Sequence, residues 1–164
     1  MSTPEYEHWQ NLTVRRPDDV RTVQGGPVPL PWQMEKQVLH NDRLTNNVLP
    51  ADFPHQVERG DAGDALTCLA LRESIRRDIE RGTGSRIHEA VELGATWNEV
   101  AAALDITPDD ARDLLRRWAE GQHHLFRHDV ERARDNPFGL GPDQHAAVLA
   151  LAELGNDERA TEGR

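Results

Sequence analysis

The sequence predicts an all-α protein with a helix-turn-helix core of three to four helices, further C-terminal helices, and an irregular N-terminal arm rich in proline and glycine. Three observations predict this fold class. Two helix-start signals lie 11 residues apart in mid-chain, which leaves room for one short helix and a tight turn. From residue 65 onward, apolar residues recur at spacings of three and four, as on one face of a helix. Before residue 65, seven of the ten prolines interrupt any such pattern.

The N-terminal arm, residues 1–64, is expected to be loosely ordered. Its run from Pro27 to Trp32 favours an extended polyproline-II conformation. This run is either a docking peptide for an aromatic-lined groove or a linker anchored by Trp32, and we favour the linker. Residues 11–16 and 20–23 are short extended pieces, which makes them candidates for a small hairpin.

Two helices are predicted directly after the arm. They form the first part of a helix-turn-helix domain that we assign to residues 65–134. Leu71, Ile75 and Ile79 repeat at intervals of four and indicate the first helix. Residues 82–84, Gly-Thr-Gly, are expected to end it. Ser85 is a suitable N-cap for a second helix, which is expected to stop at Gly94.

Residues 94–118 carry the pattern on which the fold prediction depends. Thr96 and Glu99 form a capping box that fixes a helix start. Thr107 is a second N-cap, and Pro108 suits the first position of the helix that follows. One face of each helix is apolar, with Ile106 between the two faces: Trp97, Val100, Ala101 and Leu104 on the first helix, and Ala111, Leu114, Leu115 and Trp118 on the second.

The string G-A-T-W-N-E-V-A-A-A-L-D-I-T from Gly94, with Ala111 and Trp118 after it, resembles small helix-turn-helix proteins of actinobacteria and their phages. It is more distantly similar to region 4 of sigma factors. The resemblance covers about residues 72–118, under a third of the chain, and implies a three- or four-helix domain that binds DNA. Asp105 stands where the pattern prefers glycine in the turn, and aspartate tolerates the left-handed backbone conformation better than most residues.

The candidate DNA-contacting residues follow from the geometry of the motif. In a helix-turn-helix, outward residues near the start of the second helix meet the bases in the major groove. Arginine grips guanine with two hydrogen bonds, and aspartate accepts one from cytosine. Aspartates in a first turn also favour the helix dipole, which is a purely structural role. The candidates are Thr107, Asp109, Arg112, Asp113, Arg116 and Arg117.

The net charge of −10 opposes DNA binding, because affinity for DNA comes largely from basic groups that displace phosphate counterions. Residues 72–117 hold 8 Lys and Arg against 10 Asp and Glu, so the motif segment is not basic either. Two functions therefore stay open. The leading one is a bacterial or phage transcriptional regulator that binds double-stranded DNA. The alternative is a non-catalytic protein-interaction module that binds a regulator or RNA polymerase, with acidic flanks that steer it toward a basic partner.

Composition disfavours several other classes. No run of about 18 apolar residues exists, so we expect no membrane span, and without a secretory signal we expect a cytoplasmic location. Cys68 is the only cysteine, which excludes an internal disulfide. His124 and His128 have the spacing of two metal ligands on a helix, but a solvated helix end is the favoured interpretation. We expect no catalytic activity, no cofactor and no metal.

The C-terminal part is expected to hold one more helix and a tail. Residues 127–134 either extend the second helix of the motif or form another. Pro142 suits the first position of a final helix, within an assigned range of 135–155, and residues 156–164 are expected to be disordered. The final helix either packs on its own core or forms a homodimer contact, because weak helix-turn-helix units commonly pair on DNA half-sites.

Overall fold

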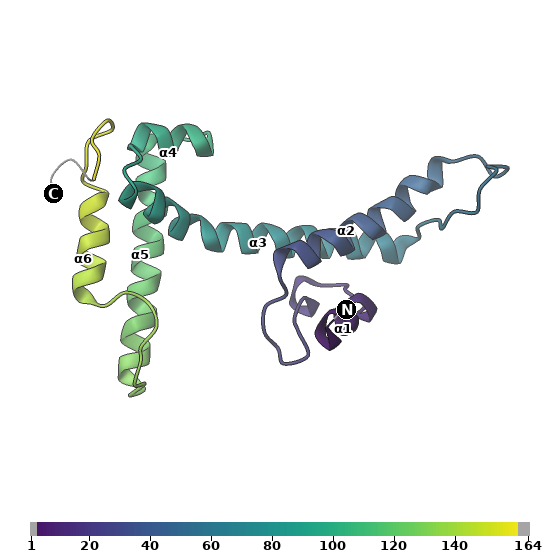
Figure 1. The fold of residues 1–164 in the computed structure, drawn as a ribbon, viewed down its shortest axis with the longest axis horizontal. Helices are drawn as coiled ribbons and strands as arrows, with labels where there is room; N and C mark the ends of the chain where they lie inside the picture. The colour runs from purple at the N-terminus through teal and green to yellow at the C-terminus, as the bar shows by residue number, and fades with distance from the viewer. Residues whose placement is uncertain (1–2, 161–164) are drawn as a thin grey trace. The chain divides into compact units, whose positions relative to one another are not determined.

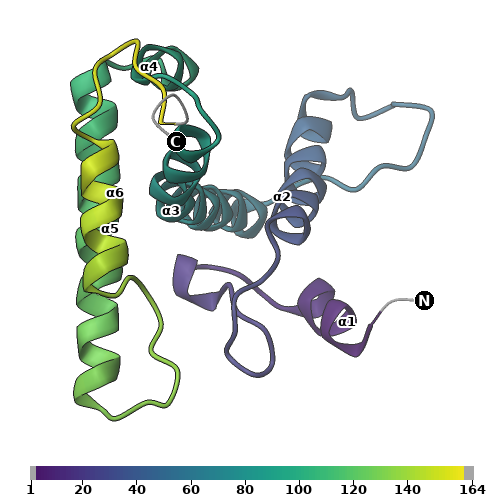
Figure 2. The ribbon, with the colours of Figure 1, turned by 60° about the vertical axis from the view of Figure 1, so that its left-hand side comes forward.

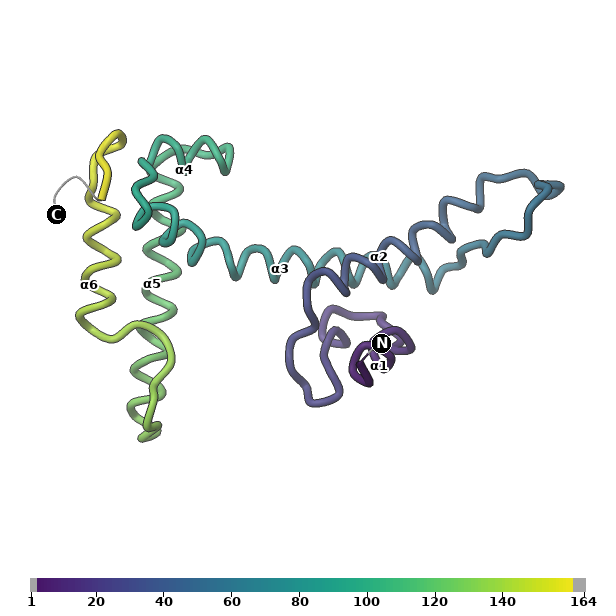
Figure 3. Tube along the Cα trace, viewed as in Figure 1, coloured from purple at the N-terminus to yellow at the C-terminus, as the bar shows by residue number. Residues whose placement is uncertain are grey.

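A computed structural model describes residues 3–160 and confirms the all-α prediction, since no strand occurs in that range. Two short 3₁₀ turns, η1 (Pro17–Asp19) and η2 (Asn46–Val48), accompany the α-helices. The chain can be followed through its helices in Figure 1 and Figure 3. The α-helices are α1 (Pro4–Asn11), α2 (Leu30–Thr45), α3 (Ala62–Glu92), α4 (Trp97–Leu104), α5 (Pro108–Glu131) and α6 (Pro142–Leu151). In the described part of the chain, no helix combines the length and apolar character that crossing a membrane requires.

The chain forms two compact units, Met1–Ile79 and Glu80–Arg164, which we call unit 1 and unit 2. The division between the two units falls inside α3. The first part of α3 therefore packs within unit 1, and its last turns pack within unit 2.

Unit 1 corrects the prediction of an irregular N-terminal arm, because it contains α1 and α2. The backbone amide of Tyr6 donates to the Thr3 hydroxyl, which caps α1, and Pro4 takes the first helical position. α2 begins directly after Pro29, so the expected polyproline-II run ends there. Proline in the first turn of a helix loses no hydrogen bond, which explains why a proline-rich sequence enters α2. The hairpin expected over residues 11–16 and 20–23 is absent from the described residues.

The core of unit 1 combines a small apolar cluster with buried polar side chains. The Ser74 hydroxyl donates to the Gln33 side-chain oxygen, and His40 is hydrogen-bonded to Asp64. These bonds join α2 to the first part of α3, and the two traces run side by side in opposite directions (Figure 3). The buried apolar cluster consists of Trp9, Val14, Val28, Ala70 and Leu71.

In unit 2, α3 continues through residues 82–84, so the expected helix break there, and the N-cap at Ser85, are wrong. The reason lies in packing against α5. A Cβ added to Gly84 would lie 2.2 Å from the Cβ of Trp118, so only glycine lets the two helices approach this closely. An interior glycine costs a helix about 1 kcal/mol. The contact with Trp118 offsets that penalty.

The structure confirms both predicted helix starts around the turn. The Glu99 amide donates to the Thr96 hydroxyl over 3.2 Å, and the Thr96 amide donates to the Glu99 carboxylate over 2.8 Å. α5 starts at Pro108 after the Thr107 cap. Asp105 ends α4 with φ 54° and ψ 44°, the left-handed conformation that the turn requires.

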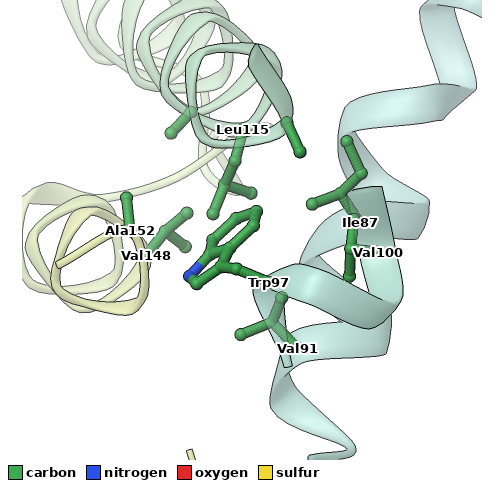
Figure 4. Close-up of a cluster of buried hydrophobic side chains, with 9 residues drawn as sticks. Ile87, Val91, Trp97, Val100, Leu115, Val148 and Ala152 are labelled. Carbon is green, nitrogen blue, oxygen red and sulfur yellow. The ribbon is translucent and has the colours of Figure 1, made fainter. Parts of the chain in front are cut away.

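α5 extends the second helix of the motif as far as Glu131, which decides between the two alternatives for residues 127–134. α4 packs against α5 near its start, and α6 runs antiparallel along α5 (Figure 1 and Figure 2). Trp97 lies fully buried where these helices meet (Figure 4). Its indole Nε1 donates to the Leu151 carbonyl over 3.0 Å. The cluster around it comprises Ile87, Val91, Val100, Ala111, Leu115, Ala119, Val148 and Ala152.

Candidate interaction face on α5

The sequence-predicted site residues lie on the first three turns of α5, but they do not all face outward. Thr107 is exposed, and its hydroxyl already accepts the Asp110 amide over 3.1 Å as the helix cap. The Asp109 side chain is 93% exposed and lies 3.0 Å from an Arg112 Nη. Thr107 therefore caps α5, and Asp109 lies in its first turn. The helix dipole stabilises the negative charge of Asp109 at this end of the helix.

Arg112 was expected to lie on the outward side of α5, and the structure contradicts this orientation. The residue is only 8% exposed. Its guanidinium donates to the Leu154 carbonyl over 2.9 Å and to the Asn156 side-chain oxygen over 2.6 Å. It also lies over the Trp97 ring, 5.3 Å from its centroid. The helical register that turns Leu115 into the core brings Arg112 against α4 and the chain end, so Arg112 fastens these parts of unit 2 together.

Asp113, Arg116 and Arg117 face outward and form a mixed-charge surface. Arg116 lies 3.0 Å from the Asp113 carboxylate and 3.4 Å from that of Glu153. The Arg117 Nε donates to the Asp113 carbonyl over 3.4 Å. A hollow of about 600 Å³ opens here, and its lining residues define what we call the α5 face: Ile106, Asp110, Asp113, Leu114, Arg116 and Arg117.

The electrostatic setting of the α5 face is acidic. From Glu80 to Arg164 the sequence holds 10 arginines, no lysine and 17 Asp and Glu, a net charge of −7. Arg86 on α3 forms an ion pair with Glu89. Arg116 is likewise paired with two carboxylates, so negative charge lies beside both of these guanidinium groups.

The C-terminal segment, residues 153–160, holds contacts that the sequence did not predict. Residues 156–164 were expected to be disordered, but residues 156–160 pack on unit 2. Residues 161–164 lie outside the described range. The Asn98 amide donates to the Asn156 carbonyl over 3.1 Å, and Arg159 donates to the Gly94 carbonyl over 2.6 Å. Both Arg159 Nη atoms also meet the Glu99 carboxylate, at 3.1 and 3.2 Å. The partners are about 60 residues apart, so no local spacing signals them.

The Glu99 carboxylate joins two of these elements. Its pKa is lowered first by the Thr96 backbone amide and then by Arg159. Both contacts favour the ionised carboxylate, so Glu99 caps α4 and holds the chain end with one charged group.

His123, one of the histidines after the motif, connects α5 with α6 and with the loop before α6. The rings of His123 and His145 stack with centroids 4.4 Å apart, which joins α5 to α6. His123 meets the Leu140 carbonyl at 3.0 Å, and His145 meets the Glu120 carboxylate at 3.1 Å. Within residues 3–160, no group of three or more His, Cys, Asp or Glu side chains is placed to hold a metal ion. Cys68 is buried in unit 1, and burial raises the pKa of its thiol.

No family model matches the chain, and no curated protein or solved structure matches it at significant similarity. The α5 face offers two carboxylates, two guanidinium groups and the apolar side chains of Ile106 and Leu114. This set of groups can hold a side chain of another molecule by apolar contact and by ion pairs at its rim.

Proposed function

We propose that unit 2 is a non-catalytic protein-interaction module that binds a partner through the α5 face. The observation that carries this proposal is the burial of Arg112. With that guanidinium bonded inside the fold, Asp109, Asp110 and Asp113 dominate the outward side of the first two turns of α5. Such a surface repels phosphate and suits a partner with basic groups.

The chemistry of the α5 face indicates what kind of partner segment fits. Ile106 and Leu114 provide the apolar part of the hollow, where a partner's apolar side chain is shielded from water. Asp110 and Asp113 lie beside them and can pair with arginine or lysine on either side of that side chain. The acidic unit around the face also raises the rate of encounter with a basic segment. The proposed ligand is therefore a short peptide segment with an apolar anchor between basic residues.

Selection from a displayed library of random peptides, with the full-length protein as bait, tests the proposal. We expect enriched peptides to combine an apolar residue with flanking arginines or lysines. Asp110→Arg should weaken peptide binding by about tenfold or more. The change removes an ion pair with a basic residue of the peptide and places a positive charge that repels it. Asp135→Arg makes the same change on the exposed loop after α5 and should leave binding unchanged. Equal loss in both variants, or no enrichment at all, would overturn the proposal.

DNA binding is a second candidate, and the geometry of the turn favours it. α4 and α5 begin at the two predicted caps, and Arg116 and Arg117 lie on the outward side of α5. In a DNA complex, Arg116→Ala should cost about 1–3 kcal/mol of specific affinity, and Asp113→Ala should raise general affinity by removing a phosphate-repelling group. Selection from a random duplex pool at low salt tests this candidate. An enriched sequence that Arg116→Ala no longer binds would replace the protein-docking proposal with a regulator that acts on DNA.

A further inference from the structure

The C-terminal segment, residues 153–160, lies against both helices of the helix-turn-helix. At the start of α4, the Asn98 backbone amide donates to the Asn156 carbonyl over 3.1 Å, and the Asn98 side-chain amide donates to the Asp157 carboxylate over 2.7 Å. On α5, the Arg112 guanidinium donates to the Asn156 side-chain oxygen over 2.6 Å. Asn156 therefore contacts both helices at once, and the segment bridges them.

The groups that the segment contacts are those that a helix-turn-helix uses on DNA. In this motif the first helix crosses the DNA backbone, and residues near the start of the second helix enter the major groove. Asn98 lies in the first turn of α4, and Arg112 and Arg116 lie in the second and third turns of α5. Amides and guanidinium groups donate to phosphate and base oxygens. The segment therefore lies where this motif would contact DNA.

The segment supplies these donors with oxygen acceptors and negative charge, as DNA phosphates would. The Asp157 carboxylate accepts from Asn98, and the Glu153 carboxylate lies 3.4 Å from an Arg116 Nη. Residues 153–160 hold three Asp and Glu against one Arg, a net charge of −2. Because like charges side by side are unfavourable, the docked segment and a DNA backbone exclude each other from this surface.

Polar contacts near the surface hold the end of the segment in place. The Arg159 guanidinium donates to the Gly94 carbonyl over 2.6 Å and to the Glu99 carboxylate over 3.1 and 3.2 Å, and its side chain is 41% exposed. Leu154 and Ala160 add partly buried apolar contacts. Because exposed ion pairs contribute little to stability, we expect the segment to detach at a lower free-energy cost than unfolding of the core.

We propose that the C-terminal segment is an autoinhibitory strap, and that its detachment exposes a DNA-binding surface on α4 and α5. In the docked state Arg112 is buried and the start of α5 is acidic, which is the state that the proposed peptide binding uses. In the detached state Arg112 loses its bonds to the segment, while Asn98 and Arg116 each lose a carboxylate. Asp109 and Asp113 remain beside the two arginines, so we expect modest affinity that low salt favours. This inference goes beyond the proposed function, because it concerns the detached state.

Arg159→Ala in the full-length protein tests this proposal, because it loosens the segment and makes the protein more acidic. Through charge alone, the loss of this guanidinium, which also leaves the Glu99 carboxylate without its cation, should weaken DNA binding. Through detachment it should strengthen binding, since apparent affinity rises with the population of the competent state. We expect about tenfold tighter binding of a fluorescent random-sequence duplex at low salt, in step with roughly tenfold faster hydrogen exchange of the Asn98 amide.

Two further variants separate detachment from charge. Arg86→Ala removes the same charge from an exposed ion pair on α3 and should not tighten duplex binding. Arg116→Ala, added to Arg159→Ala, should remove the gain in affinity while the Asn98 amide still exchanges fast. Unchanged exchange in Arg159→Ala would show that Arg159 does not hold the segment, and faster exchange without tighter binding would show that the segment covers no DNA-binding surface. Either result overturns the proposal, whereas the peptide selection tests the proposed function separately.

Discussion

The interiors of unit 1 and unit 2 are stabilised by different kinds of contact. Unit 2 buries a cluster of nine apolar residues, Trp97 among them. Unit 1 buries a cluster of only five, and five polar or charged side chains lie buried around it: Gln33, Lys36, Asp64, Thr67 and Ser74. Since a buried polar group is tolerated only when it is hydrogen-bonded, the fold of unit 1 depends on directed contacts and that of unit 2 on apolar area.

The buried polar side chains of unit 1 are hydrogen-bonded, as Gln33 and Lys36 show. The Gln33 amide donates to the Val28 carbonyl over 3.0 Å and to the Asp78 carboxylate over 2.7 Å, and its oxygen accepts from the Ser74 hydroxyl over 2.8 Å. Lys36 donates to the carbonyls of Trp9 and Gln10 and lies over the Trp9 ring. Burial lowers the pKa of Lys36, and these contacts keep its charged form in place near the end of α1.

The largest expected effect is on the apolar core of unit 2. Trp97→Ala removes a fully buried side chain and its hydrogen bond to Leu151, and should destabilise unit 2 by about 3–5 kcal/mol. Thermal melting followed by circular dichroism measures this loss. Leu104→Ala, a partly exposed position on the same helix, is the control and should lose much less. A loss under about 1 kcal/mol for Trp97→Ala would show that Trp97 does not organise the core.

The corresponding change in unit 1 removes hydrogen bonds rather than apolar area. Gln33→Met keeps the length of the side chain but leaves the Ser74 hydroxyl and the Val28 carbonyl without their partner. The expected loss is roughly 1–3 kcal/mol, the typical penalty for buried polar groups left unpaired. Amide hydrogen exchange should show the loss in α1 and α2, with protection in α5 unchanged. Gln37→Met on the same helix is the control; stability equal in both variants would mean that the polar contacts of unit 1 contribute little.

The same difference explains what the sequence predicted and what it did not. The capping box at Thr96, the N-cap at Thr107 and the apolar spacing beside them involve residues only a few positions apart, so the sequence predicts both helix starts. The buried partners of Gln33 lie up to 45 residues away, and nothing local marks them. Arg112 shows the same limit inside the motif. Its spacing places it near the outer side of α5, but contacts with residues 42 and 44 positions away bury it.

Acid should weaken unit 1 through Asp64. The pKa of the Asp64 carboxyl is lowered from 3.8 to about 2. The hydrogen bond from the Asp61 backbone amide lowers this pKa most, followed by those from His40 and Arg43. A lowered pKa stabilises the fold above pH 4, and this contribution of up to about 2 kcal/mol is lost as the pH falls from about 4 to about 2. Asp64→Asn should therefore differ most from wild type near neutral pH, and the difference should shrink across this range. Urea unfolding at several pH values measures it, with the exposed Asp52→Asn as control; a constant difference would contradict the role of Asp64.

The smallest expected effect concerns a polar contact near the surface of unit 2. Arg159 holds the C-terminal segment through the Gly94 carbonyl and the Glu99 carboxylate, but these contacts lie near the surface. Arg159→Ala should lower the melting temperature by no more than about 2 °C, because exposed ion pairs add little to stability. Its effect should be local: the Asn98 amide, which donates to Asn156, should exchange roughly tenfold faster as the segment detaches. Arg86→Ala, which removes an exposed ion pair with Glu89, is the control and should leave that amide protected. If Arg159→Ala instead destabilised unit 2 as much as Trp97→Ala, directed polar contacts would govern both units, and the contrast between them would not hold.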